Sequence, residues 1–276
     1  MKRAAGAQAA PGRPPTASRG APTKPLAAYV LHHYDWSETS LIVDLFTRER
    51  GRLAVAAKGA KRPYSQLRGV LLPFQRLHVT LTRSGAEAEV HTLRSAEWAG
   101  GAPMLAGSAL FAGFYLNELL LRLLARQDAH AALFDAYAST LPLLAAAADD
   151  SASQAALRAF ELSLLREIGV LPELDSVTQT LQPVQPQAAY ALHAESGIVP
   201  AAPGQSALSG AQWVALQAAL QHGSLAALQA ECLSALPLLR PSLRALLQYH
   251  LGPYTLRTRQ LLAELRNFVA TTASPR

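Results

Sequence analysis

The hydrophobic pattern of residues 26–97 is typical of β-strands. Five short segments rich in Val, Leu and Thr follow one another, and several alternate apolar with polar residues. They are LAAYVLHH, SLIVDLFT, GRLAVAAK, LLPFQRLHVTLT and AEAEVHTLRSAE, with turns marked by Arg50-Gly51 and Ser84-Gly85. Five antiparallel strands of this length fit a small closed barrel, because closure leaves no exposed edge. The pattern predicts an OB-fold or an SH3-like barrel over residues 26–102 and does not choose between them.

From residue 103 the apolar residues recur instead at the three- and four-residue spacing of helices. Three helices are predicted, over residues 104–125, 130–147 and 151–169. Ser151 is a good N-cap for the third helix, and Gly169 and Pro172 are typical of its end. An all-helical second domain is therefore expected over residues 103–276, which makes the fold class α+β.

An irregular insert interrupts the helical spacing between about residues 174 and 203. Within it, the stretch AAYALHAESGIVP could form a small hairpin. Helical spacing returns at Ser209, which resembles the start of a capping box with Gln212. It continues in pieces to about Thr271, and breaks are predicted near Pro237, Pro241 and Pro253.

Composition adds a charge asymmetry to this two-domain picture. Residues 1–100 hold 15 Lys+Arg against 7 Asp+Glu, whereas residues 101–276 hold 10 against 12. Positive charge gathered in one region is typical of proteins that bind polyanions such as nucleic acids. Five of the basic residues lie in residues 1–25, together with five prolines and no acid. We interpret this segment as a disordered tail, because the prolines oppose a transit-peptide helix and no secretory core is present.

The sequence excludes several classes of protein. Cys232 is the only cysteine, so neither a disulfide framework nor a zinc site built on paired cysteines can form, and no metal or other cofactor is expected. Glu118 and Arg122 interrupt the longest leucine-rich stretch, which leaves no run of the roughly 18 apolar residues that span a bilayer. The short motifs of phosphate loops, nucleophile elbows and zinc proteases do not occur. We therefore expect a cytoplasmic protein that is not an enzyme.

One segment carries the components of a nucleic-acid contact. Four cations fall within residues 58–68, just after a predicted strand, where glycine allows close backbone approach and tyrosine offers a ring on which a base can stack. The residues are Lys58, Lys61, Arg62, Tyr64 and Arg68. An ordinary solvated loop would have the same composition. Arg48, Arg50 and Arg52 on the neighbouring turn could extend the positive surface if the barrel folds them alongside.

A second candidate site lies in the helix predicted over residues 151–169. The segment LRAFELSLLREIG places Leu157 and Glu161 on one face, with Arg158 and Arg166 beside it. An apolar groove flanked by arginine could receive a short peptide that carries hydrophobic residues and carboxylates. The same spacing is also typical of a helix packed in a core with solvated arginines.

Taken together, these segments resemble the RecO family of bacterial recombination mediators. The resemblance is carried by YVLHHYDWSETSLIVDLFTRERGRLAVAAKGAKR, LRGVLLPFQRL and HTLRSAE, and most specifically by the W-S-E-T-S, F-T-x-x-x-G and A-K-G-A elements. FYLNELLLRLL, LRAFELSLLREIG and LGPYTLRTRQLL extend it over roughly residues 26–265. It implies an N-terminal OB-fold, a helical C-terminal domain and a non-enzymatic role in DNA repair and recombination.

The resemblance also implies partners and residue roles. Family members bind single- and double-stranded DNA, anneal strands coated with single-stranded DNA-binding protein, and work with RecR to load RecA, in a cytoplasmic, nucleoid-associated setting. By resemblance, Lys58 and Lys61 match DNA-contact positions, and Arg158 matches the arginine that meets the acidic C-terminal tail of the single-stranded DNA-binding protein.

One feature departs from the family pattern. Many members hold a four-cysteine zinc module in the insert, whereas residues 174–203 contain no cysteine. We interpret the expected hairpin around Tyr190 to Gly197 as a degenerate, cysteine-free remnant of that module. An RNA-binding or translation-associated OB-fold protein is the alternative, since a basic barrel does not by itself distinguish DNA from RNA.

Overall fold

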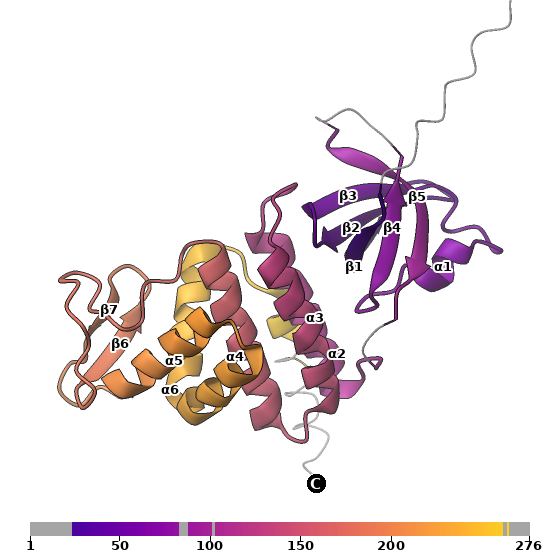
Figure 1. The fold of residues 1–276 in the computed structure, drawn as a ribbon. Coiled ribbons are helices and arrows are strands. Elements are labelled where there is room, and N and C mark those ends of the chain that lie inside the picture. Colours follow the sequence, from indigo (N-terminus) through magenta and orange to yellow (C-terminus); the bar gives the residue numbers. More distant parts are fainter. Residues whose placement is uncertain (1–23, 83–87, 101–102, 262–263, 265–276) are drawn as a thin grey trace, which may run out of the picture.

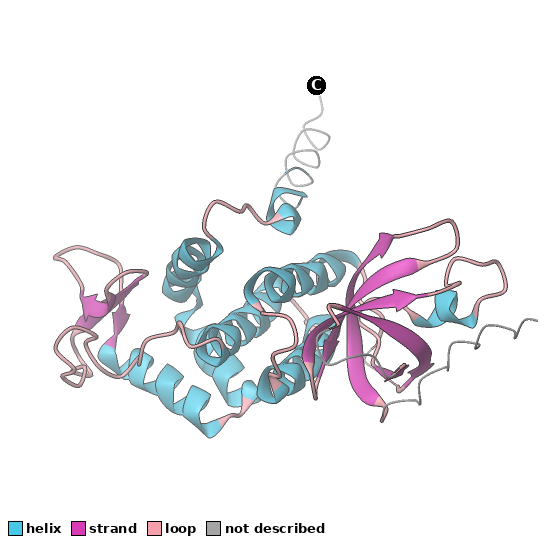
Figure 2. Ribbon diagram, turned by 90° about the horizontal axis from the view of Figure 1, so that it is seen from above, coloured by secondary structure: helices cyan, strands magenta, loops and turns pink. Residues whose placement is uncertain are grey.

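The computed structural model describes residues 24–82, 88–100, 103–261 and 264 of the chain. A β-barrel lies at one end, helices form the middle, and a small sheet lies at the far end (Figures 1 and 2). This arrangement confirms the predicted α+β class. The predicted tail falls almost wholly outside the described residues, as do the turn at Ser84-Gly85 and the predicted helix beyond residue 264.

The barrel has five strands and closes in the order β1-β2-β3-β5-β4. The strands are β1 (Leu26–Asp35), β2 (Leu41–Thr47), β3 (Gly51–Ala57), β4 (Leu77–Leu81) and β5 (Val90–Trp98). A short helix, α1 (Gln66–Val70), separates β3 from β4. β3 and β5 pair in parallel, so the expectation of a purely antiparallel barrel was wrong. A five-stranded barrel with this crossover is an OB-fold, which decides between the two predicted barrels.

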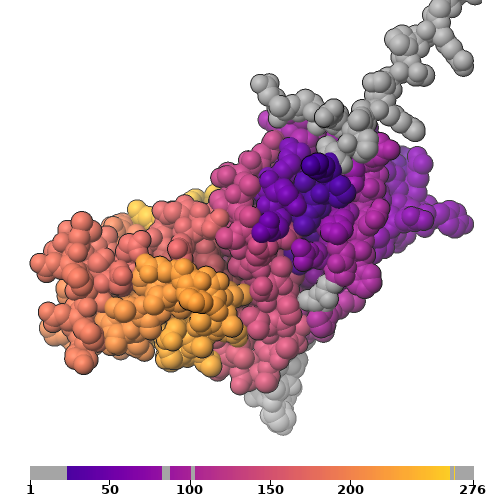
Figure 3. Space-filling model, in the orientation of Figure 1, coloured from indigo at the N-terminus to yellow at the C-terminus, as the bar shows by residue number. Residues whose placement is uncertain are grey.

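The first six residues of strand β1 are buried on both faces, and this joins the barrel to the helices. Val30 and Ala28 pack inside the barrel, whereas Tyr29 faces the helical region, because successive strand residues point to opposite sides. The Tyr29 ring lies 5.3 Å from that of Phe134 and 5.0 Å from that of Tyr137. The outer face of β1 therefore belongs to the apolar core of the helices, whereas the barrel interior is a second core, and Figure 3 shows the two regions in continuous contact.

The helical region contains five helices among the described residues. They are α2 (Gly107–Leu123), α3 (Ala131–Ala146), α4 (Asp150–Glu167), α5 (Gly210–His222) and α6 (Leu225–Leu251). The first three confirm the predicted helices to within a few residues. The N-cap of α4 is Asp149, whose carboxylate accepts from the Ala152 amide at 2.8 Å, and not Ser151 as predicted. Gly169 has the expected left-handed conformation after the helix, with φ +75°.

Helix α6 runs without interruption through Pro237 and Pro241, so the predicted breaks at these positions were wrong. The two prolines are four residues apart and both are exposed, so they share the solvent face while Leu239 and Leu243 fill the core. Carbonyl groups that lose an amide partner at the prolines can then bond water. The predicted capping box that opens α5 at Ser209 is confirmed.

The insert forms the small sheet at the end opposite to the barrel. Strands β6 (Ala189–His193), β7 (Gly197–Pro200) and β8 (Leu208–Ser209) lie in the order β7-β6-β8, which confirms the predicted hairpin. Tyr190 is buried, its hydroxyl accepts from the Gln185 amide, and its carbonyl accepts from the Trp213 indole at 3.0 Å. An aromatic core therefore stabilises the insert. No cluster of three metal-ligating side chains occurs among the described residues, and none of their helices is long and apolar enough to cross a membrane.

Candidate nucleic-acid interface and partner pocket

The basic segment after β3 forms an exposed surface on the barrel. Lys58, Arg62 and Arg68 are exposed, and none of them makes an ion pair within the described part of the chain. Tyr64 is fully exposed. Arg68 lies on α1, a helix that the sequence pattern did not predict because five residues are too few to show helical spacing. Unpaired cations beside an exposed ring are suited to phosphates and stacked bases.

Lys61 holds this surface in place. Its ammonium donates to the Ser37 carbonyl at 3.2 Å and pairs with Asp35 at the same distance, while its amide donates to the Thr39 carbonyl at 3.0 Å. The Gly59 amide also donates to the Ser40 hydroxyl, at 3.3 Å. The basic segment is thereby attached to the connection between β1 and β2. Lys61 is consequently half-buried, unlike Lys58 and Arg62.

The same connection presents an aromatic residue that sequence reasoning did not select. Trp36 lies between β1 and β2 and is 56% exposed, although indole rings usually pack in cores. Its amide and that of Ser37 both donate to the Ser40 carbonyl, which closes a tight loop. In OB-folds this connection borders the face that binds oligonucleotides. The sequence signal that could have identified Trp36 is its position in a short polar turn, where a tryptophan is unusual.

The three arginines around the β2–β3 turn make contacts within the protein. Arg48 forms a two-bond ion pair with Asp135 of α3, at 2.9 and 2.8 Å. Arg52 donates to the carbonyls of Leu121 and Leu124 at the end of α2, and burial lowers the pKa of its guanidinium. Arg50 lies 3.2 Å from a ring nitrogen of His91. Arg48 and Arg52 therefore join the barrel to the helices, and the expectation that all three could extend the positive surface toward DNA stays a prediction.

The groove expected on α4 is not exposed. Leu157 and Arg158 are each 6% exposed, and Glu161 is completely buried. The Arg158 guanidinium pairs with the Glu161 carboxylate, which also accepts from the Tyr115 hydroxyl. Burial and the neighbouring Glu161 raise the pKa of Tyr115, so its proton stays in place to donate. These residues form a buried polar network, and their contact with a peptide stays a prediction.

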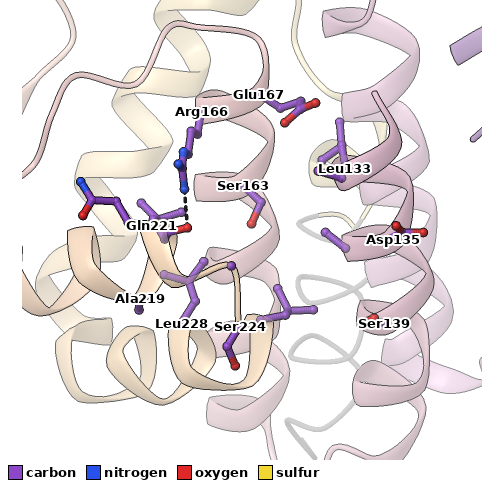
Figure 4. Close-up of a pocket in the computed structure, with 15 residues that line it drawn as sticks. Leu133, Asp135, Ser139, Ser163, Arg166, Glu167, Ala219, Gln221, Ser224 and Leu228 are labelled. Carbon is purple, nitrogen blue, oxygen red and sulfur yellow. Dashed lines mark hydrogen bonds between the residues drawn. The ribbon is translucent and has the colours of Figure 1, made fainter. Parts of the chain in front are cut away.

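Arg166 is the one member of the predicted peptide site that reaches an open pocket. A cavity of about 560 Å³ lies between α3, α4 and the α5–α6 junction (Figure 4). Leu133, Leu220 and Leu228 supply apolar walls. Arg166 points to the end of α5, where its guanidinium donates to the Leu220 carbonyl.

The acidic residues that line this pocket already have partners within the protein. Asp135 pairs with Arg48, and Glu167 lies 3.4 Å from a ring nitrogen of His130. Arg166 pairs with no carboxylate in the described part of the chain. The pocket therefore combines an apolar floor with a cation that has no acidic partner, which suits a hydrophobic residue next to a carboxylate.

Comparison with known proteins covers the barrel and the helices together. The family model "Recombination protein O N terminal" matches residues 25–102, and "Recombination protein O C terminal" matches residues 104–260. The chain is 53% identical over 241 residues to the DNA repair protein RecO of Polaromonas sp. (strain JS666 / ATCC BAA-500), which covers 87% of this chain and 95% of that protein. Its identity to DNA repair protein RecO of Paracidovorax citrulli is 54% over 251 residues, covering 87% and 96%.

Proposed function

Because the chain belongs to the RecO family of non-enzymatic DNA repair proteins, we propose that it acts as a recombination mediator. It binds single- and double-stranded DNA, anneals complementary strands coated with single-stranded DNA-binding protein and, with RecR, promotes the loading of RecA. Membership of the family confirms the resemblance drawn from the W-S-E-T-S and A-K-G-A elements.

The observation that carries this proposal is the exposed basic surface on the barrel. Lys58, Arg62 and Arg68 neutralise phosphates, Lys61 fixes the segment, and Tyr64 and Trp36 offer rings for bases. Each neutralised phosphate contributes about 0.7 to 0.9 to the slope of log K against log salt, without preference for sequence. A protein that anneals arbitrary complementary strands needs this indifference, because it must accept every base.

The pocket at Arg166 supports a second contact, with the acidic tail of the single-stranded DNA-binding protein. An acidic tail that ends in a hydrophobic residue would place that residue against Leu133 and Leu228 and a carboxylate near Arg166. The buried pair of Arg158 and Glu161 would then act through the position of α4 rather than by contact. Docking on the tail would bring the protein to coated strands, while the barrel holds DNA.

The DNA contact is tested by a matched pair of double variants. Lys58→Ala with Arg62→Ala should lower the salt slope for single-stranded DNA by about 1.5 units, since two phosphate contacts are lost. Arg240→Ala with Arg244→Ala removes two exposed cations of α6 and should leave the slope unchanged. Equal slopes for the two variants would remove the basic segment from the site. Matched RNA oligomers that compete equally with DNA would instead favour the RNA-binding alternative.

The tail contact is tested by strand annealing on DNA coated with the single-stranded DNA-binding protein, with and without that protein's C-terminal tail. Annealing should depend on the tail, and Arg166→Ala should remove most of that dependence while binding to free DNA stays the same. Annealing that ignores the tail would contradict the docking step. Loss of both activities in Arg166→Ala would contradict the separation of the two sites.

A further inference from the structure

A second basic surface lies between the barrel and the helical region. It is a groove of about 650 Å³, with β1, β2 and β3 on one side and α2 with the helical turn after Leu256 on the other. The basic segment after β3 does not line it. Four arginines do: Arg52, Arg122, Arg126 and Arg257.

The arginines of the groove and its acidic residues differ in how far they are free to meet a ligand. Arg122, Arg126 and Arg257 are exposed. The two acids that line the groove already have partners within the protein. Both oxygens of Glu118 are used: one accepts from the Arg257 amide at 2.8 Å, and the other accepts from the Thr258 amide and hydroxyl at 3.0 and 2.7 Å. Asp44 is 2% exposed and lies 3.7 Å from Arg126. A ligand in the groove therefore meets cations.

Aromatic rings line the groove together with these cations. Tyr34 on β1 is 49% exposed and Phe114 on α2 is 38% exposed, and both line the groove. Burial, together with the neighbouring His33, lowers the pKa of His32, so its imidazole is neutral at pH 7 and adds a third ring without charge. Arginines interleaved with exposed rings are the composition that binds single-stranded nucleic acid, through phosphates and stacked bases.

The groove and the basic segment lie on opposite faces of the end of β1. Tyr34 lines the groove, whereas the next residue, Asp35, pairs with Lys61 of the basic segment. Because successive strand residues point to opposite sides, the groove and the basic segment are separate surfaces. We propose that the groove binds a second single strand of nucleic acid, while the basic segment holds the first. This rests on the proposed function and gives the protein a place for each of the strands that it anneals.

The proposal predicts the stoichiometry of binding to a short oligomer. A single-stranded oligomer of about 8 nucleotides, within the site sizes of OB-folds, should bind the full chain at two sites. Arg122→Gln with Arg257→Gln should abolish one site, leave the other at its original affinity, and slow annealing of naked complementary strands at least tenfold. The matched control, Arg240→Gln with Arg244→Gln, removes two exposed α6 arginines that do not line the groove, and it should keep both sites.

Stability is measured alongside, because the Arg122 guanidinium also lies over the Tyr254 ring, at 5.1 Å. If the double variant unfolds, Arg257→Gln alone should weaken the second site and keep the first. Two intact sites and normal annealing in the folded groove variant would overturn the proposal. A groove variant that keeps both DNA sites but no longer binds an acidic peptide ending in phenylalanine would also overturn the proposal.

The wild-type chain separates this inference from the proposed function. A wild-type chain that binds no DNA would overturn the proposed function as well, whereas a wild-type chain with one DNA site would overturn only this inference.

Discussion

Cations lie near both ends of strand β3, and the contacts that they make differ between the two ends. At its start, Arg48 and Arg52 reach across to α3 and to the end of α2. At its end, Lys58 and Arg62 extend into solvent. Both groups have similar composition and lie within fifteen positions of one another.

The difference follows from the acceptors within reach of each group. The start of β3 lies against the end of α2, where backbone carbonyls have no helical partner and attract cations. Asp135 on α3 adds a carboxylate. The other end of β3 faces no such group except around Lys61, which is also the least exposed cation of the segment. A cluster of cations therefore binds a ligand only where the fold leaves it without internal acceptors.

The largest expected effect comes from the glycines at the two ends of β3. A Cβ on Gly51 would lie 1.6 Å from the Asp128 carbonyl oxygen, and its φ is +64°. Gly51→Ala should therefore lower the free energy of unfolding by about 3 kcal/mol or more, measured by urea denaturation. Gly59→Ala is the matched control, since its φ is +72° but the nearest atom is a flexible Arg62 carbon at 3.5 Å. It should cost only about 1 kcal/mol. Equal costs would show that the barrel does not dock at Gly51.

An intermediate effect is expected from the arginines themselves. Arg52→Ala should lower the free energy of unfolding by about 1 to 2 kcal/mol, because the Leu121 and Leu124 carbonyls lose their donor. Arg62→Ala should change it by less than about 0.5 kcal/mol. The DNA titration should show the reverse order, with a smaller salt slope only for Arg62→Ala. The Arg52 guanidinium is engaged by the two carbonyls, and the exposed arginines of the groove are Arg122, Arg126 and Arg257. The contrast between the two ends of β3 fails if both variants affect the same property.

Much of the fold could be predicted from periodicity. Alternation along β4 and leucine spacing along α4 follow from burial on defined faces. The parallel pairing of β3 with β5 is a long-range contact that leaves no local pattern. Breaks were wrongly predicted at the prolines of α6, because a helix tolerates proline where that side of the helix faces solvent.

The site was only partly predictable, because local sequence shows which segments are polar but not which residues meet in the fold. The sequence identified the exposed cations after β3, because that segment has too few apolar residues to be buried. It could not separate Arg158 from Arg166, which lie eight positions apart on one helix. Tertiary contacts decide which of the two arginines is buried: Arg158 pairs with Glu161, which also accepts from Tyr115, in the core. Of the groove arginines only Arg52 was named, and Arg122, Arg126 and Arg257 were missed because α2, β3 and the segment after Leu256 meet only in the folded chain.

The smallest effect is expected from Arg48 and Asp135, whose side chains are 45% and 53% exposed. In a double-mutant cycle with Arg48→Ala and Asp135→Ala, their coupling energy should be smaller than the cost of Arg52→Ala and should shrink in 1 M salt, because solvent and ions screen the pair. Arg50→Ala with Asp135→Ala should show no coupling, since Arg50 contacts His91 instead.

The same pair gives a pH dependence with a defined sign. The hydrogen bond from Arg48 lowers the pKa of Asp135 in the folded protein. The pair therefore contributes its full stability above the unfolded pKa of about 4 and loses it as the pH falls through the lower folded pKa. A coupling energy as large as the cost of Arg52→Ala, or one that salt does not change, would mean that the start of β3 is held to the helices by a charge pair. The structure assigns that role instead to Gly51, Arg52 and the aromatic core around Tyr29.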